Sequence, residues 1–423
     1  MKNVTLDLNQ LDAVNKLGNG KILCGDVGSG KSRTALAYFV LREVEGSFQL
    51  NGEGEFAWAK KPKNLYIITT ARKRNLGEWV QECALYGISS DQEDREDGIS
   101  VQIDSWNNIG KYVGVKGAFF IFDEQRLVGK GSWTKSFRKI AKDNHWILLS
   151  ATPGDNWIDY VPVFLANGFY KNRTEFNDEH VIFQPHTTFP KVKGYRGEGK
   201  LIKLRASLLV DIPIERHTTR HNITLKADYD RDLFDTVVKK RWNPYDDQPI
   251  ENVAQLFYLM RKVVNNHSDR LWHIERLLET HPRLIIFYTF DYELENLRLL
   301  KVVEGVEVAE YNGHRHDDLP ASPKWVYLVQ YTSGSEGWNC TSTNALVFYS
   351  LHYSYRMTEQ AKGRIDRRNT PYTDLYYYTI RSSSPIDMAI LRALRAKKNF
   401  NEKNCGILES IGVWEDQRCI SSG

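Results

Sequence analysis

The residues best suited to chemistry in this sequence lie in the segment GDVGSGKS, from Gly25 to Ser32. A short apolar run precedes this segment and a helix-forming stretch follows it. Gly25, Gly28 and Gly30 can take the positive φ angles of a tight loop and let backbone N–H groups approach an anion. Strand, glycine-rich loop and helix in this order are typical of a P-loop, so the sequence predicts a nucleotide site.

Within this loop, Lys31 is expected to reach the β- and γ-phosphates, and the Ser32 hydroxyl to join the coordination shell of Mg²⁺. Ser29 is expected to belong to the phosphate-binding loop itself. The alternative is a glycine turn that has only a structural role and binds no ligand. The flanking strand and helix favour the phosphate site.

Two adjacent carboxylates, Asp123 and Glu124, follow the apolar run AFFIF. Such a pair at the end of a buried strand is costly unless something uses the charges. Asp123 would hold Mg²⁺, and Glu124 would orient or deprotonate the attacking water. The alternative is a solvated strand end paired with Arg126; the P-loop upstream favours the catalytic interpretation.

Further polar groups follow later apolar runs. Ser150 and Thr152, after WILL, could hydrogen-bond to the acidic pair and sense the γ-phosphate, although Ser and Thr also commonly end strands. Arg364 and Arg367 are three residues apart on a predicted helix, so both would project from one face. Guanidinium groups there could stabilise a transferring phosphoryl group; the alternative is a solvated basic helix face.

Alternating strands and helices must position these groups. This alternation predicts a parallel sheet covered on both faces, with ligands at the carboxyl ends of the strands. In the first half the candidate strands are Ile22–Cys24, Leu65–Thr69, Val101–Ile103, Phe119–Phe122 and Ile147–Leu149. A second alternating region begins near Arg283 and continues with candidate strands at Val306–Ala309, Trp325–Val329, Ala345–Tyr349 and Leu375–Ile380.

Composition is that of an ordinary globular chain. It has 423 residues, 41% hydrophobic and 26% charged, and 57 basic against 53 acidic residues give a net charge of +4. That excess alone does not indicate nucleic acid. Five scattered cysteines favour neither disulfides nor zinc, and no signal peptide or membrane span is recognisable. We therefore expect a cytoplasmic protein without a membrane partner.

In this order the segments resemble those of the superfamily-two helicases and translocases, motors with two RecA-like lobes. GDVGSGKS, DEQR, SATP and the Q-x-x-G-R-x-x-R pattern of Gln360, Arg364 and Arg367 are similar to motifs I, II, III and VI. IITTARKRNLGEWVQE, IDSWNNI, LIIFYTF and YTSGSEGWN look like motifs Ia, Ib, IV and V. The resemblance extends from Gln10, in the position of the adenine-reading glutamine, to about Lys398.

Three features resemble the Swi/Snf-like group: LMRKVVNNH, the G-x-N of 337–339, and QAKGRIDRR. Departures are the Gln125-Arg126 end of motif II, Ser32 where Thr is commoner, and Ala71-Arg72 where Pro is usual. The chain looks like the compact versions found on phages and mobile elements. The resemblance implies an α/β fold with two tandem RecA-like lobes at 1–190 and 228–398, an irregular insertion at 191–227 and an unassigned tail at 399–423.

The resemblance also implies ATP and Mg²⁺ as cofactors and nucleic acid as partner, double-stranded or branched DNA being favoured over RNA. The protein would hold the nucleic acid through its backbone phosphates. The candidate contacts are Thr70, Arg72, Lys73, Ser105, Trp106, Thr289, Thr332 and Ser333. Trp106 and Trp338 could stack on bases or be core, and this stays open.

Three functions remain possible. The first is a monomeric ATP-driven motor moving on DNA, with hydrolysis in a cleft between the lobes. The second is a strand-separating helicase, for which a hairpin within residues 46–63 could serve as a pin. The third is an ATP-gated clamp that switches its grip without travelling.

Overall fold

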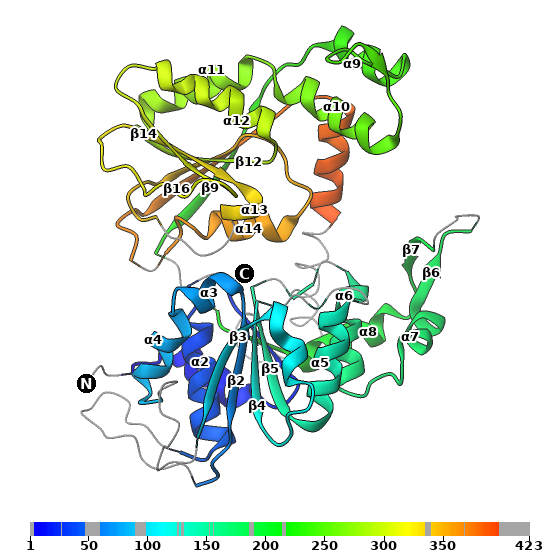
Figure 1. Cartoon of the computed structure of the whole chain (residues 1–423), viewed down its shortest axis with the longest axis vertical. Helices are drawn as coiled ribbons and strands as arrows, with labels where there is room; N and C mark the ends of the chain where they lie inside the picture. Colours follow the sequence, from blue (N-terminus) through cyan, green and yellow to red (C-terminus); the bar gives the residue numbers. More distant parts are fainter. Residues whose placement is uncertain are drawn as a thin grey trace, which may run out of the picture. The chain divides into compact units, whose positions relative to one another are not determined.

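The computed structural model describes residues 4–26, 28–46, 60–88, 99–124, 127, 131–151, 153–154, 156–185, 190–213, 217–334, 340–367 and 369–396. These residues form two compact units, which divide between Pro213 and His217. Each unit is built around one six-stranded sheet with helices on both faces (Figure 1). No helix in the described ranges is long and apolar enough to cross a membrane.

The N-terminal unit contains a parallel sheet in the order β3-β2-β4-β5-β1-β8. Its strands are β1 (Ile22–Cys24), β2 (Leu65–Thr69), β3 (Val101–Ser105), β4 (Phe119–Asp123), β5 (His145–Ser150) and β8 (Leu209–Asp211). Its helices are α1 (Leu8–Lys16), α2 (Lys31–Tyr38), the π-helix η1 (Phe39–Glu43), α3 (Ala71–Asn75), α4 (Glu78–Leu85), the 3₁₀ helix η2 (Trp106–Tyr112), α5 (Ser132–Asp143), α6 (Trp157–Ala166), α7 (Arg173–His180) and α8 (Glu198–Leu208).

Strand β4 shows why this sheet is buried on both faces. Phe119 and Ile121 belong to the core formed with α1, α2, η1 and α4, whereas Phe120 and Phe122 belong to the core formed with η2, α5, α6, α7 and α8. Successive side chains of a strand point to opposite faces, so an uninterrupted apolar run fills both cores. Polar side chains that could bind a ligand must therefore lie at the ends of the strands.

The C-terminal unit repeats this architecture with a parallel sheet in the order β13-β14-β12-β15-β16-β9. Its strands are β9 (Thr219–Lys226), β12 (Arg283–Tyr288), β13 (Glu307–Tyr311), β14 (Trp325–Gln330), β15 (Ala345–Phe348) and β16 (Asp374–Arg381). Its helices are α9 (Arg231–Lys239), α10 (Val253–Asn265), α11 (Asp269–Thr280), α12 (Asp291–Leu297), the 3₁₀ helix η3 (Arg298–Val302), α13 (Tyr331–Gly334) and α14 (Tyr355–Lys362). A short hairpin joins β10 (Trp242–Asn243) to β11 (Gln248–Pro249).

The predicted fold class is confirmed: two parallel α/β sheets, the architecture of two tandem RecA-like lobes. The expectation that residues 191–227 are irregular was wrong, because they contain α8 and the strands β8 and β9. Both strands lie at sheet edges, and β9 is partly exposed along its whole length. Strand β9 lacks the apolar run by which buried strands are recognised, whereas the short apolar run at β8 was missed.

A two-stranded antiparallel hairpin, β6 (Val181–Phe183) and β7 (Val192–Tyr195), was also not predicted; β6 lies within 1–190, expected to be the first lobe, and β7 within 191–227. It projects from the N-terminal unit beside α7 (Figure 1). Ile182, Phe183 and Val192 on this hairpin are exposed large apolar side chains.

Candidate nucleotide-binding site

The glycine-rich loop runs from the end of β1 to the start of α2, as predicted. Gly28 and Gly30 have φ angles of 89° and 81°, in the left-handed region that favours glycine. A Cβ on Gly30 would lie 2.1 Å from Gln10 Nε2, so any larger residue would disturb the loop. Gly30 is also the N-cap of α2 and offers no capping side chain. The N-terminal N–H groups of α2 therefore suit an anion.

Gln10 holds helix α1 against this loop. Its side-chain oxygen accepts from the backbone N–H of Asp7 in a capping box, and its Nε2 donates to the backbone oxygen of Ser29 over 3.1 Å. The Gln10 side chain is buried. The structure thus brings together two residues, Gln10 and Ser29, that the sequence assigned to one nucleotide site.

Lys31 lies in the first turn of α2, and its ammonium donates to the backbone oxygens of Gly25 at 2.6 Å and Asp26 at 2.9 Å. Burial lowers the pKa of Lys31 below its ordinary value; Glu124 opposes this effect and the nearby charge of Lys73 adds to it. The loop lysine is therefore within electrostatic reach of the acidic pair.

Asp123 ends β4 and is 2% exposed. One of its carboxylate oxygens, Oδ2, accepts from three side chains: Thr69 Oγ1 at 2.8 Å, Trp79 Nε1 at 2.9 Å and Lys73 Nζ at 3.0 Å. Its backbone oxygen accepts from Trp106 Nε1 at 2.8 Å. Donors from β2, α3 and α4 fix the position of this carboxylate, and η2 holds the backbone of the same residue.

Glu124 has a positive φ of 58°, a conformation that non-glycine residues rarely adopt and that concentrates at functional sites. Its Oε1 lies 3.3 Å from Lys73 Nζ. Burial lowers the pKa of Lys73, but the carboxylates of Asp123 and Glu124 outweigh burial and raise this pKa above its ordinary value. Lys73 is thus held as a cation between the two acids.

Strand order explains how the loop and the acids meet. β5 lies between β1 and β4, with Ser150 opposite Cys24 and Leu149 opposite Asp123. The Gly25 N–H donates to the backbone oxygen of Ser150 over 3.4 Å. Ser150, the last residue of β5, is therefore located between the glycine-rich loop and the acidic pair. Thr152 lies outside the described residues.

The donors at this edge fit a magnesium–nucleotide complex. The buried carboxylate and the Ser32 hydroxyl offer oxygen ligands that suit Mg²⁺. The ammonium group and the helix N–H groups can donate hydrogen bonds to phosphate oxygens. In the described part of the chain, no three His, Cys, Asp or Glu side chains converge as a metal cluster.

The arginines of the C-terminal unit do not lie on a helix, so that expectation was wrong. Helix α14 ends at Lys362 with Gly363 as its C-cap; Arg364 lies in the following turn, and Arg367 lies after that turn. Beyond the turn, the Asp366 carboxylate accepts from Arg220 on β9 and from Thr218, the residue that precedes β9. These hydrogen bonds hold the segment in a non-helical conformation. Gln360 and Arg364 are buried, at 4% and 5% exposure.

The candidate nucleic-acid contacts of the N-terminal unit differ in how far they are buried. Thr70 caps α3 by accepting from the Lys73 N–H, Arg72 is half-buried, and Ser105 is buried. Trp106 is 2% exposed and packs on Phe122 with a ring separation of 5.6 Å. The stacking alternative for Trp106 was therefore wrong, because a buried ring offers no face to a base.

In the C-terminal unit, Thr289 follows β12, while Thr332 and Ser333 lie in α13 after β14. The two strands are parallel neighbours, paired Tyr288 with Gln330, so these three hydroxyls share one edge of the sheet. Thr332 is exposed and Ser333 half-buried. Trp338 lies outside the described residues.

Asp104, near the end of β3, was not predicted, although its position resembles that of Asp123 in β4. Burial raises the pKa of Asp104, but hydrogen bonds outweigh burial and lower this pKa to about 2. The donors are Asn108 Nδ2, the Ser105 N–H, Tyr112 Oη and Arg74 Nη1. This carboxylate joins α3 and η2 beside the acidic pair.

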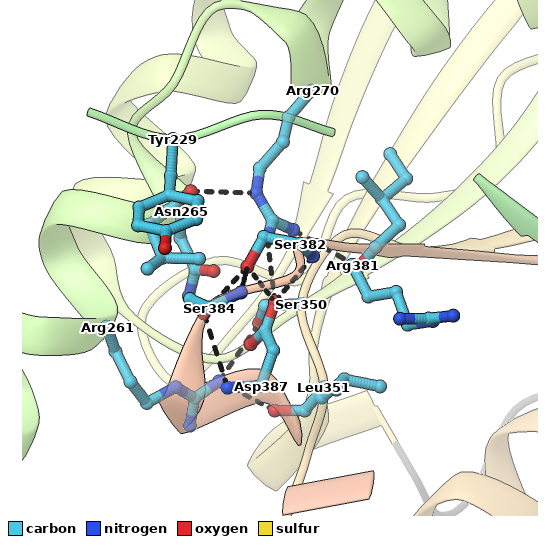
Figure 2. Close-up of polar contacts among 12 residues, drawn as sticks. Tyr229, Arg261, Asn265, Arg270, Ser350, Leu351, Arg381, Ser382, Ser384 and Asp387 are labelled. Atoms are coloured by element: carbon cyan, nitrogen blue, oxygen red, sulfur yellow. Dashed lines mark hydrogen bonds and ion pairs between the residues drawn. The ribbon is translucent and has the colours of Figure 1, made fainter. Parts of the chain in front are cut away.

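A buried polar network in the C-terminal unit also escaped prediction (Figure 2). Arg270 is fully buried and donates to the backbone oxygens of Val264 and Ile380 and to Asp387 Oδ2, at 3.1, 3.2 and 3.4 Å. Arg261, from the LMRKVVNNH segment, donates to the backbone oxygen of Leu351 at 2.6 Å. The network connects α10 and α11 to the ends of β15 and β16.

The sequence matches no protein-family model, and no curated protein matches it. Among solved structures, it is similar to the Sulfolobus solfataricus SWI2/SNF2 ATPase core in complex with dsDNA, with 16% identity, 96% of each chain covered and a TM-score of 0.41.

Proposed function

We propose that this chain is a nucleic-acid-stimulated ATPase that couples ATP hydrolysis to movement along DNA. One observation carries the proposal: neighbouring strands β1, β5 and β4 end in the glycine-rich loop, in Ser150 and in the Asp123–Glu124 pair. A phosphate cradle, a metal-binding carboxylate and a general base are the parts that phosphoryl transfer to water requires.

In this proposal each group has one task. Lys31 would neutralise phosphate charge, Asp123 and Ser32 would hold Mg²⁺, and Glu124 would take a proton from the attacking water. Bound Mg²⁺ would supply charge neutralisation at the β- and γ-phosphates. Gln10 reads adenine, and Ser150 and Thr152 sense the γ-phosphate.

The C-terminal unit would contribute Gln360, Arg364 and Arg367, whose donors would stabilise charge on the transferring phosphoryl oxygens. Fixed donors of this kind contribute roughly 3–4 kcal/mol each to transition-state stability. Burial of Gln360 and Arg364 supports this role, because a pre-ordered donor needs no reorganisation at the moment of reaction.

DNA would be held through its phosphates by groups at the strand ends of both units. Those groups are Thr70, Arg72, Lys73, Ser105, Thr289, Thr332 and Ser333. Duplex DNA is favoured over RNA because three segments resemble the Swi/Snf-like group. Binding should weaken steeply with salt and depend little on sequence. The protein is expected to act as a cytoplasmic monomer.

Triplex displacement and fork unwinding by the purified protein test the proposal. A duplex translocase should displace the third strand of a triplex in an ATP-dependent reaction and leave a fork paired. An ATP-gated clamp should do neither. If wild-type protein hydrolyses ATP and binds DNA but displaces no triplex and unwinds no fork, movement is ruled out.

A second candidate, a strand-separating helicase, is favoured by the projecting hairpin β6–β7. Its exposed Ile182 and Phe183 could pack against a base pair at a fork, as a pin must. This hairpin takes the place of the one considered within residues 46–63, most of which lies outside the described residues. Phe183→Ser should then abolish fork unwinding and spare ATP hydrolysis; equal unwinding by variant and wild type would remove the pin.

A further inference from the structure

Lys73 is the most unexpected member of the nucleotide site. Sequence patterns place it among the DNA contacts, yet its Nζ lies 3.0 Å from Asp123 Oδ2 and 3.3 Å from Glu124 Oε1. The Lys73 side chain is only 21% exposed. One ammonium group thus bridges the two carboxylates to which the proposed function gives the metal and the water.

The local fold directs Lys73 to this position. Thr70 caps α3 directly after β2 by accepting from the Lys73 N–H, so Lys73 lies in the first turn beside β4. Thr69 and Trp79 donate to the same Asp123 oxygen independently of Lys73. Asp123 would therefore keep its orientation if Lys73 left, while one of its acceptor directions became available.

A divalent cation on Asp123 would meet the full charge of Lys73 a few ångströms away, and this repulsion is strong where water is scarce. The two cations therefore compete for the acidic pair. We propose that Lys73 is a built-in counter-ion that Mg²⁺ must displace, and that its release frees Lys73 for a DNA phosphate. Metal loading and DNA binding would then be coupled through one side chain.

This inference rests on the proposed function, which assigns Asp123 to the metal. A purely structural ion pair makes the opposite prediction. If Lys73 only positioned the carboxylates, removing it would disorder the metal ligand and weaken metal binding.

The test is the affinity of nucleotide-free protein for Mn²⁺, measured by the loss of the free-ion electron paramagnetic resonance signal. Lys73→Met should bind Mn²⁺ roughly tenfold more tightly than wild type, because a competing charge is gone. Lys73→Arg, which keeps the charge, should resemble wild type. Lys139→Met, at an exposed position of α5, is the control and should also resemble wild type. Equal or weaker binding by Lys73→Met would overturn the inference.

Two further measurements separate the possible failures. In thermal unfolding, Mn²⁺ should raise the melting temperature of Lys73→Met by more than that of wild type, even if the variant is less stable without metal; an equal rise contradicts the inference. Equilibrium dialysis of Mn²⁺ with ATP tests the metal role itself, because it measures metal that accumulates with the protein, whereas ATP alone already removes the free-ion signal. If ATP promotes equal Mn²⁺ binding in both proteins, only the Lys73 inference fails. If Mn²⁺ binds to neither protein even with ATP, the proposed metal site fails too.

Discussion

The side-chain amide of Gln10 donates to the backbone oxygen of Ser29 over 3.1 Å and connects α1 to the glycine-rich loop. The same amide nitrogen occupies the space that a side chain on Gly30 would need. The loop conformation and the position of α1 therefore depend on each other. A nucleotide base contacting Gln10 would be sensed directly by the loop.

Gln10→Glu tests this connection. The substitution keeps an oxygen for the Asp7 N–H but replaces the donor facing Ser29 with an acceptor, which costs about 1–3 kcal/mol. ATP affinity, measured by calorimetric titration, should fall about tenfold or more. Asn9→Asp is the matched control, because Asn9 on the same helix donates at the surface to Pro213. Loss of affinity in the control alone would contradict the connection.

Glu124→Gln should separate binding from chemistry. The amide cannot accept a proton from water, so turnover should fall by roughly 10²–10⁴-fold while ATP still binds. Steady-state phosphate release and nucleotide titration measure the two effects. Glu307→Gln, at an exposed position of β13, should leave both unchanged. Near-normal turnover in Glu124→Gln would remove Glu124 from its role.

Asp104 should make stability depend on pH. Its pKa is lowered to about 2 in the folded state from an ordinary 3.8, so its contribution is complete above pH 4 and is lost as the pH falls toward 2. Asp104→Asn should cost about 2 kcal/mol of unfolding free energy at pH 7. Denaturant unfolding at several pH values should show this deficit shrinking below pH 4. A deficit that stays constant down to pH 2.5 would exclude the charge as its cause.

Arg270→Met should destabilise the C-terminal unit by about 3–5 kcal/mol, because Asp387 is left buried without its cation. Arg276→Met, on the same helix, removes an exposed ion pair with Glu279 and should change the unfolding free energy by less than about 0.5 kcal/mol. Denaturant unfolding followed by circular dichroism compares them. Similar effects of the two substitutions would show that burial of the Arg270 network is unimportant.

Much of the fold of both units could be predicted, because a parallel strand that is buried on both faces has a continuous apolar sequence. Ile22–Cys24 and Leu65–Thr69 match β1 and β2 residue for residue, and the acidic pair lies at the end of β4, with Asp123 as its last residue and Glu124 directly after it. Strand order then brings the loop, Ser150 and the acids to one edge. No three-dimensional information beyond the parallel-sheet rule was needed for that.

The failures have a common physical cause. Arg364 and Arg367 were assigned to a helix by spacing, but tertiary bonds of Asp366 to β9 outweigh local helix propensity. For Trp106 the sequence left base stacking and a core position open, and Lys73 was assigned to the DNA contacts. Their partners, Phe122 and Asp123, are distant in sequence, so only the folded chain shows them.

The most direct test of the central claim is steady-state ATP turnover with and without duplex DNA, for wild type and for Lys31→Ala. A DNA motor predicts Mg²⁺-dependent turnover that duplex DNA raises at least about tenfold, and loss of both basal and stimulated turnover in Lys31→Ala, which lacks the ammonium facing the phosphates. Wild-type turnover that DNA leaves unchanged, together with full activity in Lys31→Ala, would contradict the account.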